Sequence, residues 1–507
     1  MKTLFYRTVF FLFLLFTFSL SLTHHVEAQP VLSQQSISMG GGASYITGPA
    51  ANFYNPANLM IRDNIRPNKL ILAQGGFYLS EGIKAEDLTQ DYIGFGDYFT
   101  NFDATKPRPD YSSSEILQLR FSNDNSIFSN SARFDIIAFG FSFTRKQHAF
   151  SLALRSRSTN SFEISRGWYD DTFQSSGQED KLERTLRQNV QTYHELSLGF
   201  AREVSMVNGW IPGLNRLYFG IAPKLMVGGM FFDGDYTSTY FRDQGGNDMQ
   251  YTSQYSARSV ADKQPSLAPK SDASSSTNLM TGQRQSLFEP TGTGVGLDVG
   301  LTFVMSLDDD NSLAPKSDGP LRKSLRFSVS MTDIGFISYN EQPLVLRTSS
   351  DTTRAASTPE NIHRDFTGQI GEFTSFISEK SDKSESLGAA TSVEKKFNYK
   401  LPAALHLGSA LQYNRFLVAV DAEYQISPVR FDQQGWHTRV GTEFRLLKFI
   451  PLRSGITLNP SMETTLGIGA GIDAGLWEVS VATQLKQGYN KKAYTVGLAV
   501  AALQFRF

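Results

Sequence analysis

The sequence predicts an all-β protein, a transmembrane antiparallel β-barrel of about 14 strands, from three observations. Residues 1–28 have the pattern of an export signal, yet no later stretch is long and apolar enough to form a membrane-spanning helix. Short apolar or alternating runs recur along the rest of the chain, with almost no 3.6-residue helical period. The chain also ends on an alternating strand whose last residue is Phe507. Because only helices and closed barrels satisfy their backbone polar groups in lipid, these observations favour a barrel.

Residues 1–28 are predicted to be a secretory signal peptide that is cleaved before Gln29. Lys2 and Arg7 precede an uncharged run rich in Phe and Leu, and Val26-Glu27-Ala28 provides a small-residue cleavage motif. A one-pass anchor is the less favoured alternative, because the apolar run is shorter than the roughly 18–20 residues of a spanning helix. We therefore expect export and, with a barrel fold, residence in the outer membrane of a Gram-negative bacterium, in contact with its lipid.

Fourteen runs are predicted to be strands of the barrel. In order they are residues 69–80, 134–145, 147–158, 193–204, 216–232, 294–306, 324–337, 401–413, 415–426, 436–446, 451–458, 464–473, 476–486 and 494–507. Tight turns at Lys146, Asn414 and Ala474-Gly475 are expected at one end. Four long polar joins are expected to be extracellular loops, at residues 81–133, 159–192, 233–293 and 338–400. This alternation of short and long joins is typical of outer-membrane barrels.

Two features of the sequence do not fit this pattern of strands: one strand-like segment and one sequence repeat. The strand-like segment 115–121 would break an even count, so we place it within the first long loop, and the choice between fourteen and sixteen strands stays open. The heptapeptide Ser-Leu-Ala-Pro-Lys-Ser-Asp occurs at residues 266–272 and again at 312–318, and no physical reason for the repeat is evident.

The last strand, residues 493–507, is predicted to cross the membrane. Counting back by twos from Phe507 gives one apolar face, which consists of Phe505, Leu503, Ala501 and Ala499. Arg506 and Gln504 point to the other face, although both faces become apolar further upstream, which leaves open a buried strand of a soluble sandwich. A terminal Phe on an alternating strand resembles the signal by which outer-membrane barrels are passed to their assembly machinery. The candidate assembly signal is therefore Phe507, Phe505 and Leu503.

The composition excludes several classes of function. The 507 residues contain 48 Lys and Arg against 49 Asp and Glu, with no basic cluster interleaved with aromatics, so we expect no nucleic-acid partner. There is no Cys, and the His residues after the signal stand singly, so we expect no disulfide, metal site or cofactor. Gly292–Gly296 and Gly467–Gly471 place glycines at alternate positions, which indicates small residues on one barrel face and not a phosphate-binding loop. We expect no enzymatic activity.

Residues 29–66 form a Gly- and Pro-rich region before the first strand. It contains Gly40-Gly41-Gly42 and then Asn55-Pro56-Ala57, a pre-set turn whose Asn side chain can cap nearby backbone groups. This order resembles the FadL-type family of outer-membrane transporters for hydrophobic compounds, with its relatives in secretion and gliding systems. The resemblance implies a hatch over residues 29–66 inside a barrel over residues 67–507. A ring of this size also needs a plug, because its lumen is wider than side chains alone can fill. The candidate hatch and ligand-path residues are Phe53, Tyr54, Asn55, Pro56 and Ala57.

Later stretches resemble the same family, among them Asp333-Ile334-Gly335-Phe336 and Leu401-Pro402-Ala403. The resemblance implies passive transport or binding of a hydrophobic small molecule, although the loops differ from those of the fatty-acid importer, whose substrate does not carry over. The alternative is a docking or shuttle component of a protein secretion or surface-assembly system without transport activity. The hatch favours transport and the long loops favour docking. The expected partners are the barrel-assembly machinery and either a hydrophobic small molecule or secretion-system proteins.

Overall fold

The computed structural model describes residues 33–62, 66–83, 127–168, 181–204, 216–242, 249–260, 290–307, 323–339, 344–348, 354–356, 389–393, 396–426, 436–447, 449–458, 464–487 and 493–507. The signal peptide, the segment 115–121 and both copies of the repeated heptapeptide lie outside these ranges. No helix of the described residues is long and apolar enough to span a membrane.

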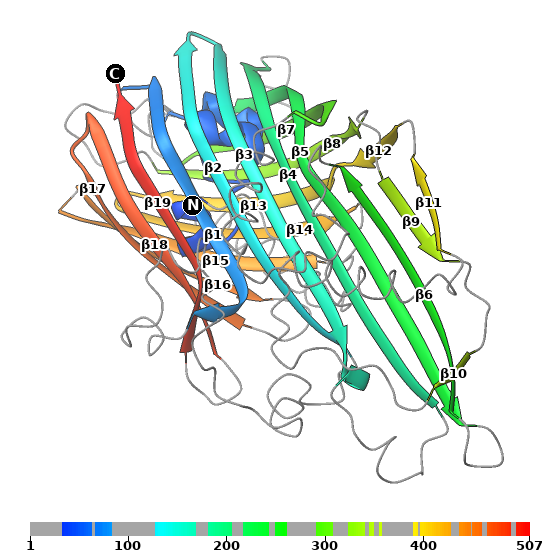
Figure 1. Cartoon of the computed structure of the whole chain (residues 1–507). Helices are drawn as coiled ribbons and strands as arrows, with labels where there is room; N and C mark the ends of the chain where they lie inside the picture. The colour runs from blue at the N-terminus through cyan, green and yellow to red at the C-terminus, as the bar shows by residue number, and fades with distance from the viewer. Residues whose placement is uncertain are drawn as a thin grey trace.

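Fourteen of the described strands form a closed ring (Figure 1). They are β1 (Lys69–Ile83), β2 (Ile127–Arg145), β3 (His148–Ser165), β4 (Lys181–Glu203), β5 (Arg216–Arg242), β7 (Gly292–Ser306), β8 (Ser324–Tyr339), β13 (Ala404–Tyr413), β14 (Phe416–Gln425), β15 (Trp436–Leu446), β16 (Ile450–Leu458), β17 (Thr464–Asp473), β18 (Trp477–Gln487) and β19 (Ala493–Arg506). Each is antiparallel to the next, and β19 pairs with β1, with Phe505 opposite Leu70. The antiparallel barrel of about 14 strands predicted from the sequence is confirmed.

Five further strands extend the sheet beyond the ring: β6 (Met249–Val260), β9 (Leu344–Thr348), β10 (Arg354–Ala356), β11 (Ala389–Val393) and β12 (Phe397–Lys400). β6 continues the sheet beside the second half of β5, and β9 and β10 pair with β6. β5 is 27 residues long, well beyond the roughly 9–11 residues that cross a bilayer. All four joins expected to be loops, 81–133, 159–192, 233–293 and 338–400, contain strand residues. Their Ser, Thr and Tyr residues favour strands without the apolar alternation by which the others were recognised.

The ring has two unlike ends. The tight turns at Lys146, Asn414 and Gly475 have positive φ angles of 54°, 55° and 77°, and lie at the end where β19 finishes, which we call the turn end. The extended strands β4, β5 and β6 project from the opposite end, which we call the loop end (Figure 1). The predicted turns therefore lie together at one end of the ring.

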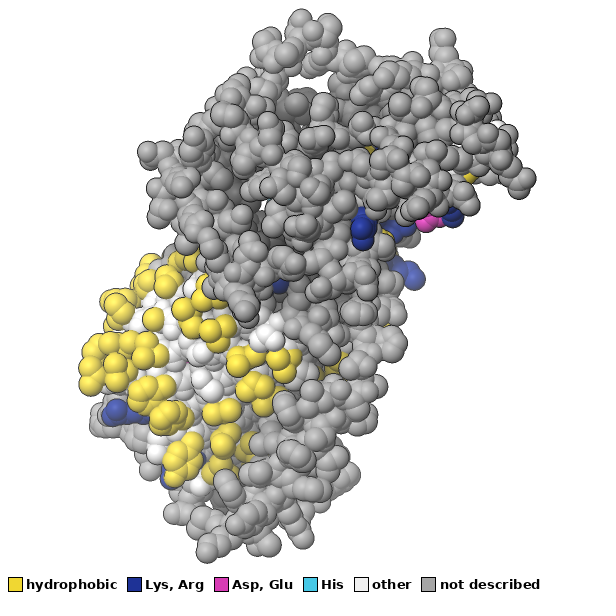
Figure 2. Space-filling model, turned by 90° about the horizontal axis from the view of Figure 1, so that it is seen from below, with side chains coloured by type: hydrophobic (Ala, Val, Ile, Leu, Met, Phe, Trp, Pro, Cys, Tyr) yellow, Lys and Arg dark blue, Asp and Glu magenta, His cyan; other side chains and the backbone are white. Residues whose placement is uncertain are grey.

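The outside of the ring is apolar and the inside is largely polar. In β3, Phe150 and Leu154 are 41% and 42% exposed, whereas Ala153 and Arg155 are buried on the lumen side. Similar exposed Leu, Ile, Val and Phe side chains occur around the ring, and Figure 2 shows them gathered over a broad face with Lys and Arg only at its margin. An apolar outer wall around a polar interior is the arrangement of a barrel whose outer face contacts lipid.

A β-bulge changes the face assignment in β19. Phe507 is 51% exposed and Arg506 is buried in the lumen, as the alternation predicts. Ala501 and Ala499 were expected on the same face as Phe507, but both are buried toward the lumen. Gln504 is opposite Glu478 while Ala501 is opposite Ser480, so β19 contains one residue more than β18 between these pairs. One extra residue exchanges the two faces of a strand, which makes that part of the sequence prediction wrong.

We expect Phe507→Asp to lower the yield of folded, heat-modifiable barrel, because it removes the terminal apolar side chain that stacks on Phe141 with ring centroids 6.0 Å apart. Phe416→Asp is the matched control, since Phe416 is 54% exposed at the same end of the ring but is not terminal. Heat-modified mobility of membrane fractions measures the yield. Equal losses in the two variants would show that position 507 has no special role in assembly.

The N-terminal segment lies inside the ring and consists of α2 (Gln34–Met39) and two 3₁₀ helices, η1 (Gly48–Phe53) and η2 (Pro56–Met60). α2 packs against β15 to β19, whereas η1 and η2 pack mainly against β2 to β5 and β7 (Figure 1). A capping box at Ser33 starts α2, and each 3₁₀ helix begins with Pro in its first turn. All side chains of residues 33–60 are buried except Gln35 and Thr47. We call residues 33–60 the hatch.

Candidate functional site

Glycines on the inner wall allow the hatch to approach the strands closely. A Cβ atom at Gly220 would lie 2.2 Å from the backbone nitrogen of Ala57, and one at Gly441 would lie 2.4 Å from the carbonyl oxygen of Met39. The same relation to hatch atoms holds for Gly140, Gly199, Gly300, Gly408, Gly455, Gly467 and Gly469. The alternating glycines of β17 therefore make room for α2 of the hatch, in agreement with the predicted face of small residues.

Asn55 fixes the hatch to the wall. Its Nδ2 donates hydrogen bonds to the carbonyl oxygen of Ala43 at 3.1 Å and to Thr302 Oγ1 of β7 at 2.9 Å. Its Oδ1 accepts one from the backbone N–H of Ala57 at 3.1 Å, as expected for a capping Asn. Asn58, which the sequence did not single out, also donates to Ala43 and accepts from Thr302. Both amides are completely buried and join the turn to the barrel wall.

Phe53 and Tyr54 face different surroundings. The ring of Phe53 lies under two cations, with Arg155 Cζ 4.7 Å and Lys224 Nζ 5.3 Å from its centroid. The Tyr54 hydroxyl is 3.2 Å from Ser33 Oγ, and its carbonyl oxygen accepts a hydrogen bond from Ser330 of β8 at 2.6 Å. Burial raises the pKa of Tyr54, so its hydroxyl keeps the proton for this contact. Phe53 therefore faces the lumen on the loop-end side of the hatch, while Tyr54 connects Ser33 of the hatch with Ser330 of the wall.

A buried cluster of charges lies on the loop-end side of Phe53, and we call it the central cluster. It consists of Asp135, Arg155, Arg157, Glu195, Lys224, Asp298 and Asp333. Lys224 Nζ lies 2.7 Å from both Asp298 and Asp333 and 3.4 Å from Glu195. Asp333 has a φ of 55° at a bulge of β8, which turns its carboxylate toward these cations. A complete cluster of this kind adds little net stability, because desolvation offsets most of the attraction, whereas loss of one partner leaves an uncompensated buried charge.

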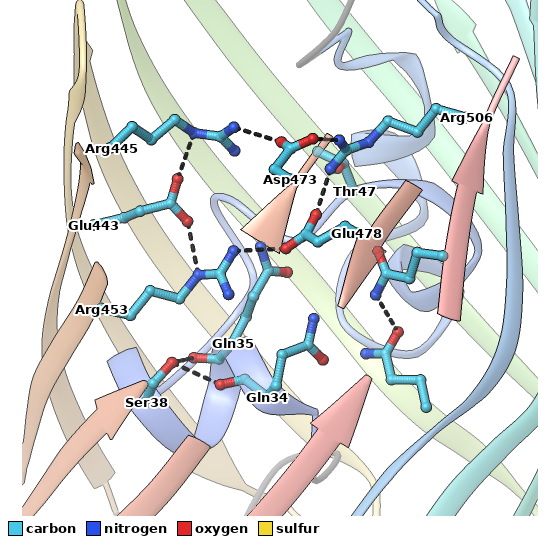
Figure 3. A network of polar contacts seen from close by, with 12 residues as sticks. Gln34, Gln35, Ser38, Thr47, Glu443, Arg445, Arg453, Asp473, Glu478 and Arg506 are labelled. Carbon is cyan, nitrogen blue, oxygen red and sulfur yellow. Dashed lines mark hydrogen bonds and ion pairs between the residues drawn. The ribbon is translucent and has the colours of Figure 1, made fainter. Parts of the chain in front are cut away.

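A second buried network, the turn-end cluster, lies beside α2 (Figure 3). It consists of Glu443, Arg445, Arg453, Asp473, Glu478 and Arg506. Arg445 lies 2.7 Å from Asp473, Arg453 lies 2.8 Å from Glu443 and 3.0 Å from Glu478, and Arg506 contacts Asp473 and Glu478. Five neighbouring strands, β15 to β19, supply these side chains. The hatch is therefore held between charge networks on its two sides.

A pocket remains in the lumen between the hatch and the loop end, and we call it the vestibule. It has a volume of about 850 Å³, including the part open to solvent. Its lining comprises Phe53, Arg133, Phe134, Asp135, Arg155, Arg157, Ser158, Thr159, Asn189, Gln191, Tyr193, Thr332, Asp333, Tyr399, Pro402, Ala404, His406, Glu423 and Gln425. Phe53 is the hatch residue among them. Within the described ranges no group of three or more His, Cys, Asp or Glu side chains is arranged to hold a metal ion.

The sequence matches one family model, that of a family of unknown function, DUF5723, over residues 82–483. The chain belongs to this family. No curated protein matches the sequence. Similar solved structures include the toluene transporter TodX of Pseudomonas putida, at 14% identity and a TM-score of 0.41, covering 95% of this chain and 99% of that one. A FadL homologue of Pseudomonas aeruginosa matches at 10% identity and a TM-score of 0.40, covering 95% and 98%. The monoaromatic hydrocarbon channel CymD matches at 11% identity and a TM-score of 0.41, covering 94% of this chain and 98% of that one.

These solved structures are FadL-type channels, the family that the sequence resembles. In the DUF5723 chain the predicted hatch residues Asn55, Pro56 and Ala57 lie against β5 and β7, and Phe53 reaches the vestibule. Tyr54 lies deeper and does not line that pocket. Sequence reasoning missed the central cluster, although single charged residues inside otherwise apolar strands, such as Asp298 in β7, were a signal for it.

Proposed function

We propose that this DUF5723 protein is an outer-membrane barrel that its hatch closes at rest and that binds or passes a small molecule through the vestibule. The observation that carries the proposal is a lumen occupied by residues 33–60, with the vestibule on the loop-end side of this segment. The apolar outer wall supports residence in a membrane. By this proposal the turn end faces the periplasm and the loop end faces the outside.

The FadL-type resemblance suggests a hydrophobic compound as the ligand. Aromatic surface for such a compound is present beside the vestibule, where Phe231, Tyr339, Phe397 and Tyr399 pack together with ring centroids of the contacting pairs 4.9–5.6 Å apart. All but four of the vestibule residues nevertheless carry polar side chains. A hydrophobic compound is therefore one candidate ligand. The polar lining favours a second candidate ligand from a different chemical class.

We expect Phe53→Ala to raise the entry of small solutes into proteoliposomes severalfold. The substitution removes the phenyl group that separates the vestibule from the rest of the hatch. The matched control is Phe150→Ala, which changes a Phe that is 41% exposed on the outside of the ring. Solute entry is followed by liposome swelling. If Phe53→Ala and wild type are equally impermeable to every solute tested, the vestibule does not lead through the hatch.

The docking role remains the second candidate, and the sheet extension of β4, β5, β6 and β9 to β11 favours it, since transport needs no strands beyond the ring. Gly228 of β5 is opposite Gly292 of β7, so removal of residues 231–289 would join two paired strands by a short turn. If docking through these strands is the function, a strain with this shortened barrel should show the phenotype of a strain without the chain, whereas a strain with Phe53→Ala, which leaves these strands intact, should not. A wild-type phenotype would argue against docking.

A further inference from the structure

The vestibule is lined by hydrogen-bonding groups from opposite sides of the ring. Asn189, Gln191 and Thr159 come from β3 and β4, whereas His406 and Gln425 come from β13 and β14. A hydrocarbon in this space would remove water from Thr159, Asn189 and Gln191 and offer no hydrogen bonds in return, whereas His406 Nε2 and Gln425 Nε2 already have protein partners in Thr332 and the carbonyl oxygen of Ala403. Each buried polar group left without a partner costs on the order of 1–3 kcal/mol. The lining therefore disfavours a purely apolar ligand.

Most charged groups of the vestibule lining are already paired with an oppositely charged side chain. Arg155 Nε donates to Asp135 at 2.7 Å, Arg157 Nη1 donates to Asp333 at 2.8 Å, and Glu423 accepts from Arg439 at 2.7 Å. A charged ligand would have to break one of these pairs and leave a buried charge behind, which is more costly than the new contact is favourable. The lining therefore also disfavours a ligand with a net charge.

What the vestibule offers is a set of donors and acceptors that can be used without breaking an ion pair. Arg157 is the clearest case, because its Nη1 serves Tyr193 and Asp333 while no described residue accepts from its Nη2. Its side chain lines the pocket and is 16% exposed. The amides of Asn189 and Gln191 can act both as donors and as acceptors.

From this arrangement we infer that the vestibule binds a small uncharged molecule carrying several hydroxyl or amide groups, such as a sugar. Hydroxyl groups can donate to Asp333 and accept from Arg157 or Gln191, and the C–H faces of a sugar ring can lie against Tyr193, Tyr399 and Phe53. This inference rests on the proposed function and names the ligand class for the same pocket.

Saturation-transfer NMR on the whole protein in lipid nanodiscs tests the ligand class, with protein-free nanodiscs subtracted. The probes are sucrose and N-acetylglucosamine as uncharged polar molecules, toluene as the hydrocarbon, and arginine and glutamate as charged molecules. We expect signals from the two sugars. Gln191→Leu and Thr159→Val, which each remove one polar group from the lining, should weaken sugar binding about two- to tenfold. Thr237→Val in β5 is the matched control, because Thr237 lies outside the lining, and it should leave binding unchanged.

The outcomes separate the ligand class from the proposed function. A toluene or arginine signal that depends on Gln191 and Thr159, with no sugar signal, overturns the inference and leaves the proposed function standing. Sugar signals that neither variant changes, or no probe signal that depends on the lining, also overturn it. In those cases the solute entry of Phe53→Ala decides the proposed function separately.

Discussion

Removal of residues 33–60 is expected to turn a closed barrel into an open, ion-conducting pore. A ring of about eight strands can be filled by its own side chains, whereas larger rings enclose an open lumen, so a fourteen-stranded ring without its hatch should conduct. The ring itself should survive the deletion, because β1 pairs with β19 through strand hydrogen bonds that involve no hatch residue. In planar bilayers we expect conductance to rise on the order of tenfold or more over wild type, whose lumen the hatch fills.

A substitution in the wall should reproduce the effect without a deletion. A Cβ atom at Gly300 of β7 would lie 2.0 Å from Asn55 Oδ1, so Gly300→Ala should displace the hatch and raise conductance. Gly296→Ala is the control on the same strand, since a Cβ there meets no atom closer than 3.3 Å. If the hatch deletion conducts no more than wild type, the hatch does not close the lumen and the docking role becomes the better explanation.

The ring could be predicted from the sequence because its strands must be apolar toward lipid and small or polar toward the lumen, and this leaves a period of two. The hatch could be placed because its Gly and Pro residues do not fit a strand, and Asn55 has the expected capping role. The positions of the β-bulges could not be predicted from the sequence. One extra residue, as in β19, leaves no mark on a sequence whose two faces are both apolar, so Ala499 and Ala501 were assigned to the wrong side.

The central cluster could not be predicted from the sequence either, and the reason differs from the one that applies to the bulges. Its members are brought together by ring closure and not by sequence spacing: Lys224 and Asp333 are 109 residues apart, and Arg157 and Asp333 are 176 apart. The seven members come from six strands, and only Arg155 and Arg157 share one, β3. A single buried charge in a strand indicates that a partner exists, but not which strand supplies it. The ligand class could not be predicted from the sequence either, because the vestibule is formed by residues from opposite sides of the ring.

Lys224→Met is expected to lower the free energy of unfolding by about 3–5 kcal/mol, because it removes the ammonium group shared by three buried carboxylates. Lys224 and Asp298 are both fully buried, so water cannot replace the lost charge without opening the lumen. The expected result is a loss of the heat-modifiable, folded form at a lower urea concentration than for wild type. Lys181→Met is the control, because Lys181 is 60% exposed and pairs with an exposed Glu183, a contact of little net stability.

A second substitution distinguishes loss of charge balance from loss of packing. Asp298→Asn in the Lys224→Met background removes one of the carboxylates that Lys224 neutralises. Within the described residues, Asp298 contacts Lys224 and accepts a hydrogen bond from the backbone N–H of Asp333. If uncompensated charge causes the instability, the double variant should be more stable than Lys224→Met alone, with a coupling energy of about 0.5–3 kcal/mol in the double-mutant cycle. If the double variant is as unstable as the sum of the single variants, Lys224 contributes through packing against Phe53, and the central cluster does not hold the hatch by charge.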